Sequence, residues 1–404
     1  MYLNIVQDNG KIIRHLISKE YFFDTLLYGQ VGYIGTQSKE ANALNIFKAY
    51  FSEAKAILFD ETNKAILEQL TSLNVPEFMV GKNEKTIFER EKFSFMYYTS
   101  GSTGFPVAAL KTKINIELEV EALANVLQQY AIKRVLVTVP FIHLYGTLLG
   151  LMYPLLNDID IVLKEHFLPH DLLDMIEPHT MVVTTPLYIK ALNHLSEERD
   201  LRQSIFISST APLDVGNIQQ FRHKYHADII QIFGSTETGG IAYKINHDEI
   251  WKPFKYVQIS TNANQELKVK SPFVSKILYE NEFKETKGEI DTFDYVEENK
   301  EGFTLLGRSS KMFKLAGKRY STIQIENILE RIDEIHKALV FVVLEKGSLR
   351  GEYLDITLES HRTFSIQEIR KILQNHLSNL KFSITLNIVK EIPVNQVGKK
   401  LRIK

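Results

Sequence analysis

Short runs of β-branched and aliphatic residues alternate with longer amphipathic stretches over most of the chain. The runs are typical of strands that are buried on both faces, and the stretches between them are typical of helices. Because helix-length segments separate the strands, the order predicts a parallel α/β sheet. The predicted strands are 56–59, 134–139, 181–185, 204–208 and 228–233, and the clearest predicted helices are 116–129 and 215–225.

Segment 135–156 contains no Asp, Glu, Lys or Arg and is long enough to cross a membrane. Two prolines and two glycines interrupt it, however. We therefore predict a buried strand over 135–139 that ends at Pro140, followed by an apolar helix over 146–156 beneath a pocket, and no membrane span.

The pattern changes in the last third of the chain. Segment 259–303 has short alternating stretches, which predict a small antiparallel or barrel-like region. The chain then predicts a compact α+β domain, with helices over 323–332 and 365–377 and strands over 338–344 and 385–389. Gly307 and the pair Ser309-Ser310 suggest a flexible link at 308–311, so we expect an N-terminal domain 1–308 hinged to a C-terminal domain 309–404.

Composition excludes several kinds of chemistry. The 404 residues include no cysteine, so disulfides, thiolate metal sites and a cysteine nucleophile are ruled out, and a cytoplasmic location is expected. The formal net charge of −1 provides no field that would attract nucleic acid, and none is expected as a partner. The first residues lack a basic stretch before an apolar core, so no secretory signal is expected.

A loop rich in hydroxyls and glycines, 97–106, suits a phosphate chain, because its backbone can approach an anion while its hydroxyls donate. Phe105-Pro106 follows the last glycine, so the loop is not a Walker A motif. The alternative is an ordinary surface turn. The candidate phosphate-binding residues are Thr99, Ser100, Gly101, Ser102, Thr103 and Gly104.

Further motifs follow this loop in a fixed order: Pro-Phe-Ile-His-Leu-Tyr-Gly at 140–146, Ser-Thr-Ala-Pro-Leu at 209–213, Phe-Gly-Ser-Thr-Glu-Thr-Gly-Gly at 233–240, Asp294, 302–308, 314–317, 324–326 and the terminal 393–402. From Tyr97 to the C-terminus the set resembles the adenylate-forming (AMP-binding) superfamily of acyl-CoA synthetases, adenylation domains and carrier-protein ligases. It is most similar to the short AMP-ligases of aryl polyene and fatty-acid-like pathways.

The resemblance implies a site for ATP and Mg²⁺. The loop would hold the β- and γ-phosphates, Phe233 and Gly234 would meet the adenine, Thr236 the α-phosphate, and the Glu237 carboxylate the Mg²⁺. Taken alone, Phe233-Gly234 could equally be a strand end in the core and Glu237 a solvated carboxylate.

The resemblance also implies ribose contacts and a catalytic lysine. Asp294 and Arg308 would bind the ribose, although Phe293 stands where the family has glycine and Asp291 is a nearby rival. Lys399 would bridge the substrate carboxylate and the α-phosphate, and its alternative is a solvated basic tail.

His143, Gly146 and Ser209 match the acid pocket of the family. Segment 135–156 has no acidic residue that could pair with a substrate ammonium, which favours an uncharged aryl or acyl tail over a free amino acid. His143 alone could equally be a core residue.

Three departures from the family pattern bear on activity. Val107 replaces the lysine that normally ends the loop, and the sequence leaves open whether Lys111 compensates. Ser310 replaces the usual Asp or Lys of the hinge. The region before Tyr97 is shorter than in full-length relatives. Gly317 would line the pantetheine path.

These features together predict an AMP-forming acid–thiol ligase. An aromatic or fatty acid would be activated as an acyl-adenylate and passed to the phosphopantetheine of an acyl carrier protein. The alternatives are a ligase that uses free coenzyme A and a weakened nucleotide-binding protein of the same fold.

Overall fold

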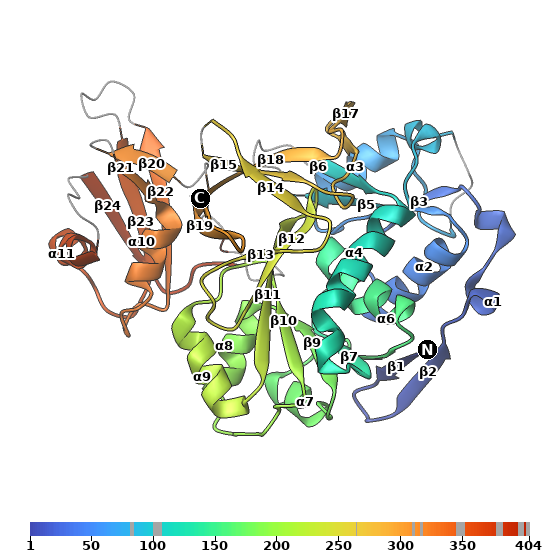
Figure 1. The fold of residues 1–404 in the computed structure, drawn as a ribbon, viewed down its shortest axis with the longest axis horizontal. Coiled ribbons are helices and arrows are strands. Elements are labelled where there is room, and N and C mark those ends of the chain that lie inside the picture. The colour runs from blue at the N-terminus through green and yellow to red at the C-terminus, as the bar shows by residue number, and fades with distance from the viewer. Residues whose placement is uncertain are drawn as a thin grey trace. The chain divides into compact units, whose positions relative to one another are not determined.

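The computed structural model describes residues 1–80, 85–99, 107–263, 265–308, 312–315, 318–344, 352–376, 383–394 and 400. The chain forms two compact units (Figure 1). The first contains Met1–Ser260 and Lys268–Ile290, and the second contains Thr261–Leu267 and Asp291–Lys404. The predicted hinge at 308–311 lies largely outside the described residues and stays a prediction.

The first unit contains a nine-stranded sheet of order β13-β12-β11-β10-β9-β7-β8-β1-β2. Its strands from β11 to β1 run parallel, and β12, β13 and β2 pair antiparallel at the two edges. The bounds are β1 Tyr2–Val6, β2 Ile12–Leu16, β7 Arg134–Val137, β8 Asp160–Leu163, β9 Thr180–Thr184, β10 Ile205–Ser208, β11 Asp228–Ser235, β12 Gly239–Ile245 and β13 Lys252–Pro253. The parallel strands predicted from the apolar runs are confirmed.

A second, six-stranded sheet of the same unit has the order β17-β16-β6-β5-β4-β3. Strands β3, β4 and β5 are parallel, whereas β6, β16 and β17 pair antiparallel. The bounds are β3 Val31–Ile34, β4 Lys55–Leu58, β5 Phe95–Thr99, β6 Val107–Lys111, β16 Ile277–Tyr279 and β17 Phe283–Glu285.

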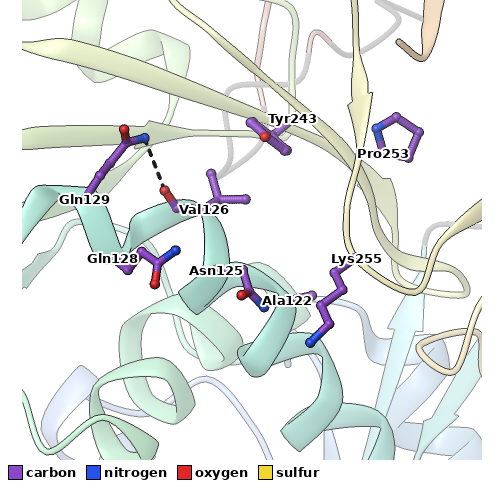
Figure 2. Close-up of a pocket in the computed structure, with 8 residues that line it drawn as sticks. All are labelled: Ala122, Asn125, Val126, Gln128, Gln129, Tyr243, Pro253 and Lys255. Carbon is purple, nitrogen blue, oxygen red and sulfur yellow. Dashed lines mark hydrogen bonds between the residues drawn. The ribbon is translucent and has the colours of Figure 1, made fainter. Parts of the chain in front are cut away.

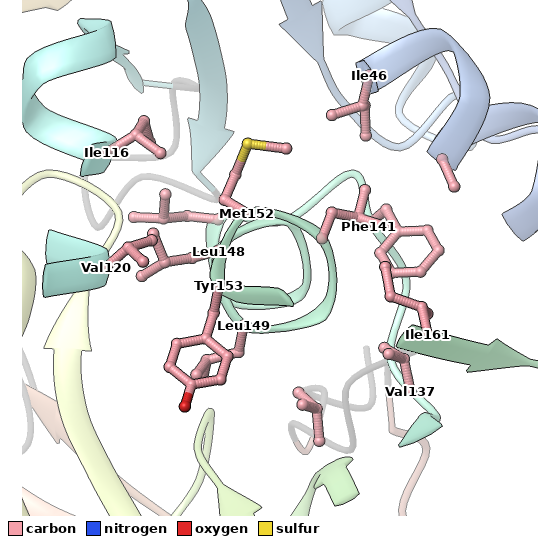
Figure 3. Packing of buried hydrophobic residues seen from close by; sticks show 14 of the residues in the cluster. Ile46, Ile116, Val120, Val137, Phe141, Leu148, Leu149, Met152, Tyr153 and Ile161 are labelled. Carbon is pink, nitrogen blue, oxygen red and sulfur yellow. The ribbon is translucent and has the colours of Figure 1, made fainter. Parts of the chain in front are cut away.

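The two sheets share a helical layer. Side chains alternate along each strand, so Val135 and Val137 of β7 belong to one core cluster and Leu136 to another. The shared cluster also takes residues of β4 and β5 from the second sheet. Its helices are α2 (Lys39–Phe51), α4 (Lys113–Leu127), α5 (Leu144–Thr147) and α6 (Tyr153–Leu156), as Figure 3 shows around Phe141, Leu148 and Met152.

The outer faces of both sheets are covered as well. Helices α7 (Pro169–Asp174), α8 (Pro186–His194) and α9 (Val215–Tyr225) pack on the nine-stranded sheet, and α8 and α9 lie beside each other (Figure 1). Helix α3 (Lys64–Ser72) packs on the six-stranded sheet. The first unit therefore has five layers, alternating helices and sheets, with its parallel strands buried on both faces.

The predicted apolar helix over 146–156 is confirmed, but with an irregular centre. Helices α5 and α6 are joined by a π-helical turn, Leu148–Met152. Gly146 is required here, because a Cβ atom would lie 2.0 Å from the carbonyl oxygen of Pro140. No helix among the described residues has the length and apolarity needed to span a bilayer.

The predicted antiparallel region after residue 258 is formed by β14 (Gln258–Thr261), β15 (Glu266–Lys270), β18 (Glu289–Glu298) and β19 (Phe303–Arg308). Asp294 of β18 pairs with Arg308 of β19, and a register shift follows between Tyr295 and Val296.

The second unit also contains a three-stranded sheet of order β22-β23-β24. Helices α10 (Thr322–Leu329) and α11 (Ile366–His376) pack on one face of it, and β20 (Met312–Leu315) pairs with β21 (Lys318–Ser321). The predicted strands are β22 (Lys337–Leu344) and β24 (Ser383–Val389), and the sequence analysis missed β23 (Glu352–Glu359) between them. The predicted α/β class with a smaller α+β part is confirmed.

Candidate nucleotide and acid site

The turn between β11 and β12 carries two of the predicted nucleotide ligands, Thr236 and Glu237. The strands pair antiparallel on either side of it, with a register shift at Phe233 and Gly234. Ser235 closes the turn, since its backbone N–H donates to the hydroxyl of Thr238 at 3.0 Å and its own hydroxyl accepts from the Thr238 N–H at 3.2 Å. The side chains of Thr236 and Glu237 therefore project from a short, hydrogen-bonded connection.

Glycines make this turn possible. A Cβ atom at Gly234 would lie 2.3 Å from the carbonyl oxygen of Gly239, and Gly239 itself has a φ of +73°. A Cβ atom at Gly240 would lie 3.2 Å from the ring of Phe254. Gly234, which the resemblance assigned to nucleotide binding, thus has a packing reason of its own: the two strands approach too closely for any side chain.

Two buried charged residues lie beneath the turn, and the sequence analysis did not pair them. The Lys111 Nζ atom donates to the carbonyl oxygens of Phe273 at 2.6 Å and Glu237 at 3.2 Å. A carboxylate oxygen of Glu119 accepts from the Gly240 N–H at 2.6 Å. Burial lowers the pKa of Lys111 and raises the pKa of Glu119, and each charge partly offsets the effect on the other.

Lys111 does not stand in for the missing loop lysine. Thr99 pairs with Val107 at one end of the β5–β6 pair, and Phe95 pairs with Lys111 at the other. Lys111 lies four positions after Val107 along the strand, a distance of roughly 13 Å. The Lys111 ammonium is bonded to backbone carbonyls in the interior, so Val107 leaves the end of the loop without a cation from this strand.

Phe233 packs against an aromatic residue that the sequence analysis missed. The ring centroids of Phe233 and Trp251 lie 5.4 Å apart with an interplanar angle of 48°. The ammonium of Lys244 lies 4.9 Å from the centroid of the Trp251 ring. Trp251 is the single tryptophan of the chain, and that scarcity is the only sequence signal that could have drawn attention to it.

Of the predicted acid-pocket residues, Ser209 lies at the carboxyl end of a parallel strand, and Tyr145, between His143 and Gly146, contacts the same edge of the sheet. The Ser209 hydroxyl, directly after β10, donates to the carbonyl of Ile232 in β11 at 2.9 Å. The Tyr145 hydroxyl of α5 reaches the carbonyl of Thr184, the last residue of β9, at 2.9 Å and that of Ile207, next to the last residue of β10, at 2.8 Å. Open α/β sheets bind ligands at this edge.

His143 directly precedes α5, and its carbonyl accepts from the Thr147 N–H at 3.0 Å. Burial lowers the pKa of His143, and the carboxylate of Asp60 opposes that effect. Asp60 follows β4 of the other sheet, so the sequence around His143 could not reveal it. Segment 135–156 itself contains no acidic residue. The carboxylate of Asp60, from a distant part of the chain, nevertheless acts on His143.

Asp294 is buried, with 8% of its surface exposed, and its N–H donates to the Thr292 hydroxyl at 3.2 Å. The rival Asp291 is exposed. Phe293, in the place of the family glycine, has a φ of +61°, in the left-handed region that glycine adopts without strain. The backbone conformation of a glycine is thus kept here in spite of the phenylalanine.

Several predicted residues lie outside the described part of the chain: Ser100, Gly101, Ser102, Thr103, Gly104, Ser310, Gly317 and Lys399. Lys400, the neighbour of Lys399, is described, and its Nζ atom bonds to the carboxylate of Glu330 and to the carbonyl of Ala338 at 2.7 Å. No group of three His, Asp or Glu side chains among the described residues could form a metal site.

A surface pocket of about 320 Å³ lies elsewhere, between α4 and the strands β12 and β13 (Figure 2). Amides of Asn125, Gln128 and Gln129 line it together with Tyr243 and Lys255. None of the predicted site residues lines this pocket, so it is separate from the candidate site.

Comparisons with known proteins agree with the motif order. The model of the AMP-binding enzyme family matches residues 32–289. Similar curated proteins include the 3,4-dihydroxybenzoate–[aryl-carrier protein] ligase of Bacillus anthracis, 22% identical over 84% of this chain and 81% of that protein, and the 2-succinylbenzoate–CoA ligase of Oceanobacillus iheyensis, 24% identical over 87% and 78%.

Two solved structures share the fold. The o-succinylbenzoate coenzyme A synthetase of Bacillus subtilis, in complex with ATP and magnesium, matches with a TM-score of 0.79 at 19% identity, covering 98% of this chain and 94% of that one. ATP-bound MatB of Rhodopseudomonas palustris matches with a TM-score of 0.77 at 17% identity, covering 98% and 93%.

Proposed function

We propose that this chain, which belongs to the AMP-binding enzyme family, is an AMP-forming acid–thiol ligase that uses ATP and Mg²⁺. It activates an aromatic or fatty carboxylic acid for transfer to the phosphopantetheine of an acyl carrier protein. The acid attacks the α-phosphorus of ATP and expels pyrophosphate. The thiol then attacks the acyl carbon and releases AMP.

One observation carries this proposal. The Tyr145 hydroxyl of α5 bonds to carbonyls of β9 and β10 near their carboxyl ends, and the Ser209 hydroxyl after β10 bonds to a carbonyl of the adjacent strand β11. The helix that follows His143 therefore lies at the edge of the sheet that also carries Phe233. A nucleotide subsite and an acid subsite side by side are what the reaction requires, because it must hold two anions together.

The residues present fit the nucleotide and the metal. Gly234, Gly239 and Gly240 keep the strands beside the turn closely packed, and Glu237 on that turn offers the hard oxygen ligands that Mg²⁺ prefers. In the proposal Thr236 contacts the α-phosphate, Asp294 and Arg308 hold the ribose, and Lys399 neutralises the charge that develops during adenylation.

The acceptor is proposed to be a carrier protein, as in the Bacillus anthracis relative, which the chain covers over 81% of its length. Free coenzyme A is the second candidate, because the Oceanobacillus relative is a CoA ligase. Both acceptors present the same phosphopantetheine thiol, so the site chemistry is shared.

ATP–pyrophosphate exchange with a panel of aromatic and fatty acids tests the proposal. We expect exchange with at least one acid, and thioester formation from that acid with a phosphopantetheinylated carrier at a higher kcat/KM than with coenzyme A. A higher value with coenzyme A would assign the acceptor to the second candidate. Absence of exchange with every acid of the panel would contradict the proposed substrate class.

A further inference from the structure

Lys111 and Glu119 are opposite charges held deep in the first unit. Lys111 is fully buried and Glu119 is 2% exposed. Burying two charges is costly, and hydrophobic residues of similar volume often serve stability equally well. A buried pair of this kind therefore calls for an explanation beyond stability, and the groups that each residue contacts provide one.

One charged group contacts the backbone of the Glu237 turn, and the other contacts the backbone of the strand that directly follows it. The Lys111 ammonium and the N–H of Ser275, at 2.9 Å, both donate to the carbonyl of Glu237. The Glu119 carboxylate accepts from the N–H of Gly240. A cation thus meets the carbonyl in the middle of the turn, and an anion meets the N–H of the second residue of β12, which follows the turn.

Rigid elements hold both groups in place. Lys111 ends β6, and the next residue, Thr112, is the N-cap of α4, its hydroxyl accepting from the Asn115 N–H at 3.2 Å. Glu119 lies on the same helix, one turn beyond Asn115. A strand end and the first turns of a capped helix fix side chains better than loops do.

We propose that Lys111 and Glu119 are positioning residues that hold the Glu237 turn in the geometry that Mg·ATP requires. This inference rests on the proposed role of Glu237 and Thr236 and adds a cause for their placement. Neither Lys111 nor Glu119 touches the substrates in the proposal. They act through the backbone of the segment that carries the side chains of Thr236 and Glu237.

The chain offers a matched control in Lys224. Its ammonium is also buried, 8% exposed, and donates to backbone carbonyls, those of Leu195 and, at 3.1 Å, Asn193. These carbonyls lie at the end of α8, on the outer face of the nine-stranded sheet. Lys224→Met therefore removes a buried ammonium of the same kind without touching the Glu237 turn.

The test compares the magnesium and ATP dependence of pyrophosphate exchange in four variants. Glu119→Gln keeps an acceptor oxygen for Gly240, whereas Glu119→Leu removes it. We expect Glu119→Leu and Lys111→Met each to lower kcat and to raise the KM for Mg·ATP. In each variant the two changes should combine to lower kcat/KM by about tenfold to a hundredfold, because small misplacements of catalytic groups are costly. The KM for the acid should change by less than about twofold.

Glu119→Gln should stay close to the wild type, and Lys224→Met should lower the melting temperature without changing the kinetics of the folded enzyme. Where Lys111→Met does not fold, the double variant Lys111→Met/Glu119→Leu removes both charges and leaves neither unpaired. A folded double variant with the kinetics of the wild type would overturn the inference, and so would equal losses in Glu119→Gln and Glu119→Leu.

The wild type separates this inference from the proposed function. If the wild type exchanges pyrophosphate with no acid, the proposed function fails, and calorimetric titration with Mg·ATP then tests the positioning role directly. Weaker binding in the double variant and unchanged binding in Lys224→Met support the role. Equal affinity in all three proteins contradicts it.

Discussion

Phe293, next to Asp294, has a strained backbone conformation and stands at a position where the family has glycine. Phe293 adopts a left-handed conformation, which costs a non-glycine residue about 1–2 kcal/mol. Its side chain is 54% exposed, so it recovers little of that cost by burial. The strain lies directly beside the carboxylate proposed to hold the ribose.

Phe293→Gly should therefore raise the free energy of unfolding by about 0.5–1 kcal/mol, the relief of strain less the entropy that glycine adds to the unfolded chain. Urea denaturation measures the change. Phe293→Ala keeps the strain while removing the ring, and should bring no gain. Equal stabilisation by alanine and glycine would show that the ring, and not the backbone, is responsible.

The buried ammonium of Lys39 contributes to the pH dependence of the protein's stability. Its ammonium donates to the carbonyls of Thr138 and Lys164, and burial lowers its pKa from 10.5 to about 8, an effect that Glu165 partly opposes. Between these pH values the unfolded chain keeps a proton that the folded protein has released. The free energy of unfolding therefore rises as the pH increases from 8 towards 10.5.

We expect Lys39→Met to remove about 2 kcal/mol of that rise, measured by urea denaturation at pH 7, 8 and 9.5. Lys111, whose pKa burial also lowers, should keep a residual slope in the same direction. Lys48→Met, which removes a partly exposed ammonium beside Asp24, serves as the control and should leave the slope unchanged. An unaltered slope in Lys39→Met would refute the assignment.

At the scale of elements, helix α5 is fixed by contact between backbones. Gly146→Ala would place a methyl group 2.0 Å from the Pro140 carbonyl oxygen, so the helix or the preceding segment must shift. We expect a loss of about 1–3 kcal/mol in the free energy of unfolding, as for other overpacked sites. Catalytic turnover should fall as well, because His143 lies between these two residues.

Gly216→Ala in α9 is the matched control for Gly146→Ala. The nearest atom to its added methyl group would be the Asp214 carboxylate at 3.4 Å, an ordinary contact. Alanine in a helix is favoured over glycine by up to about 1 kcal/mol, so this variant should be as stable as the wild type or more so. A loss of stability in both variants would mean that the clash with Pro140 is not the cause.

Strands were predictable from the sequence where both of their faces are buried. Runs such as 181–185 and 204–208 are buried throughout and mainly apolar, and the helix 215–225 was predicted with its observed bounds. Strand β23 was missed although its apolar residues alternate with Asp355, Thr357 and Glu359, a pattern typical of a half-buried strand, because the search relied on continuous apolar runs. The π-helical turn at 148–152 has no periodicity that a short apolar segment could reveal.

The candidate site was predictable only where its residues lie in one motif. Phe233, Glu237 and Ser209 were proposed as site residues from motif order and spacing, and their roles stay predictions. The contacts of Glu119 with Gly240 and of Phe233 with Trp251 depend on the fold, since the first pair is 121 residues apart in sequence. One signal was present: Lys111 ends the otherwise apolar run of β6, and a charge there implies a buried partner.

At the scale of the whole molecule, the second compact unit carries the proposed catalytic lysine. Lys400 is anchored to Glu330 and to the start of β22, so the chain next to Lys399 is tied to a folded element. Lys399→Ala should depress pyrophosphate exchange by several orders of magnitude, since a cation aimed at developing charge is lost. Thioester formation from a presynthesised adenylate should survive far better.

Lys390→Ala removes an exposed lysine of the same unit and should leave both half-reactions intact. Equal loss of both half-reactions in Lys399→Ala would contradict a role confined to adenylation.

In the proposed acid pocket, groups from both sheets of the first unit act on the substrate region, because His143 follows one sheet and Asp60 follows the other. Segment 135–156 offers no carboxylate to a substrate ammonium, and burying an unpaired ammonium is costly. We expect phenylpropionate to support faster pyrophosphate exchange than phenylalanine at equal concentration. His143→Ala should change which acid is preferred and leave the KM for Mg·ATP nearly unaltered.

The variant Asp60→Asn distinguishes between two roles for the carboxylate that acts on His143. If Asp60 acts only on the histidine, the variant should keep the preference for phenylpropionate, because no substrate charge depends on it. If the wild type instead activates phenylalanine as well as phenylpropionate, and Asp60→Asn abolishes the activation of phenylalanine alone, then Asp60 supplies the counter-charge for an ammonium. The enzyme would in that case belong with the amino-acid-activating ligases, and the aryl or acyl assignment would have to be given up.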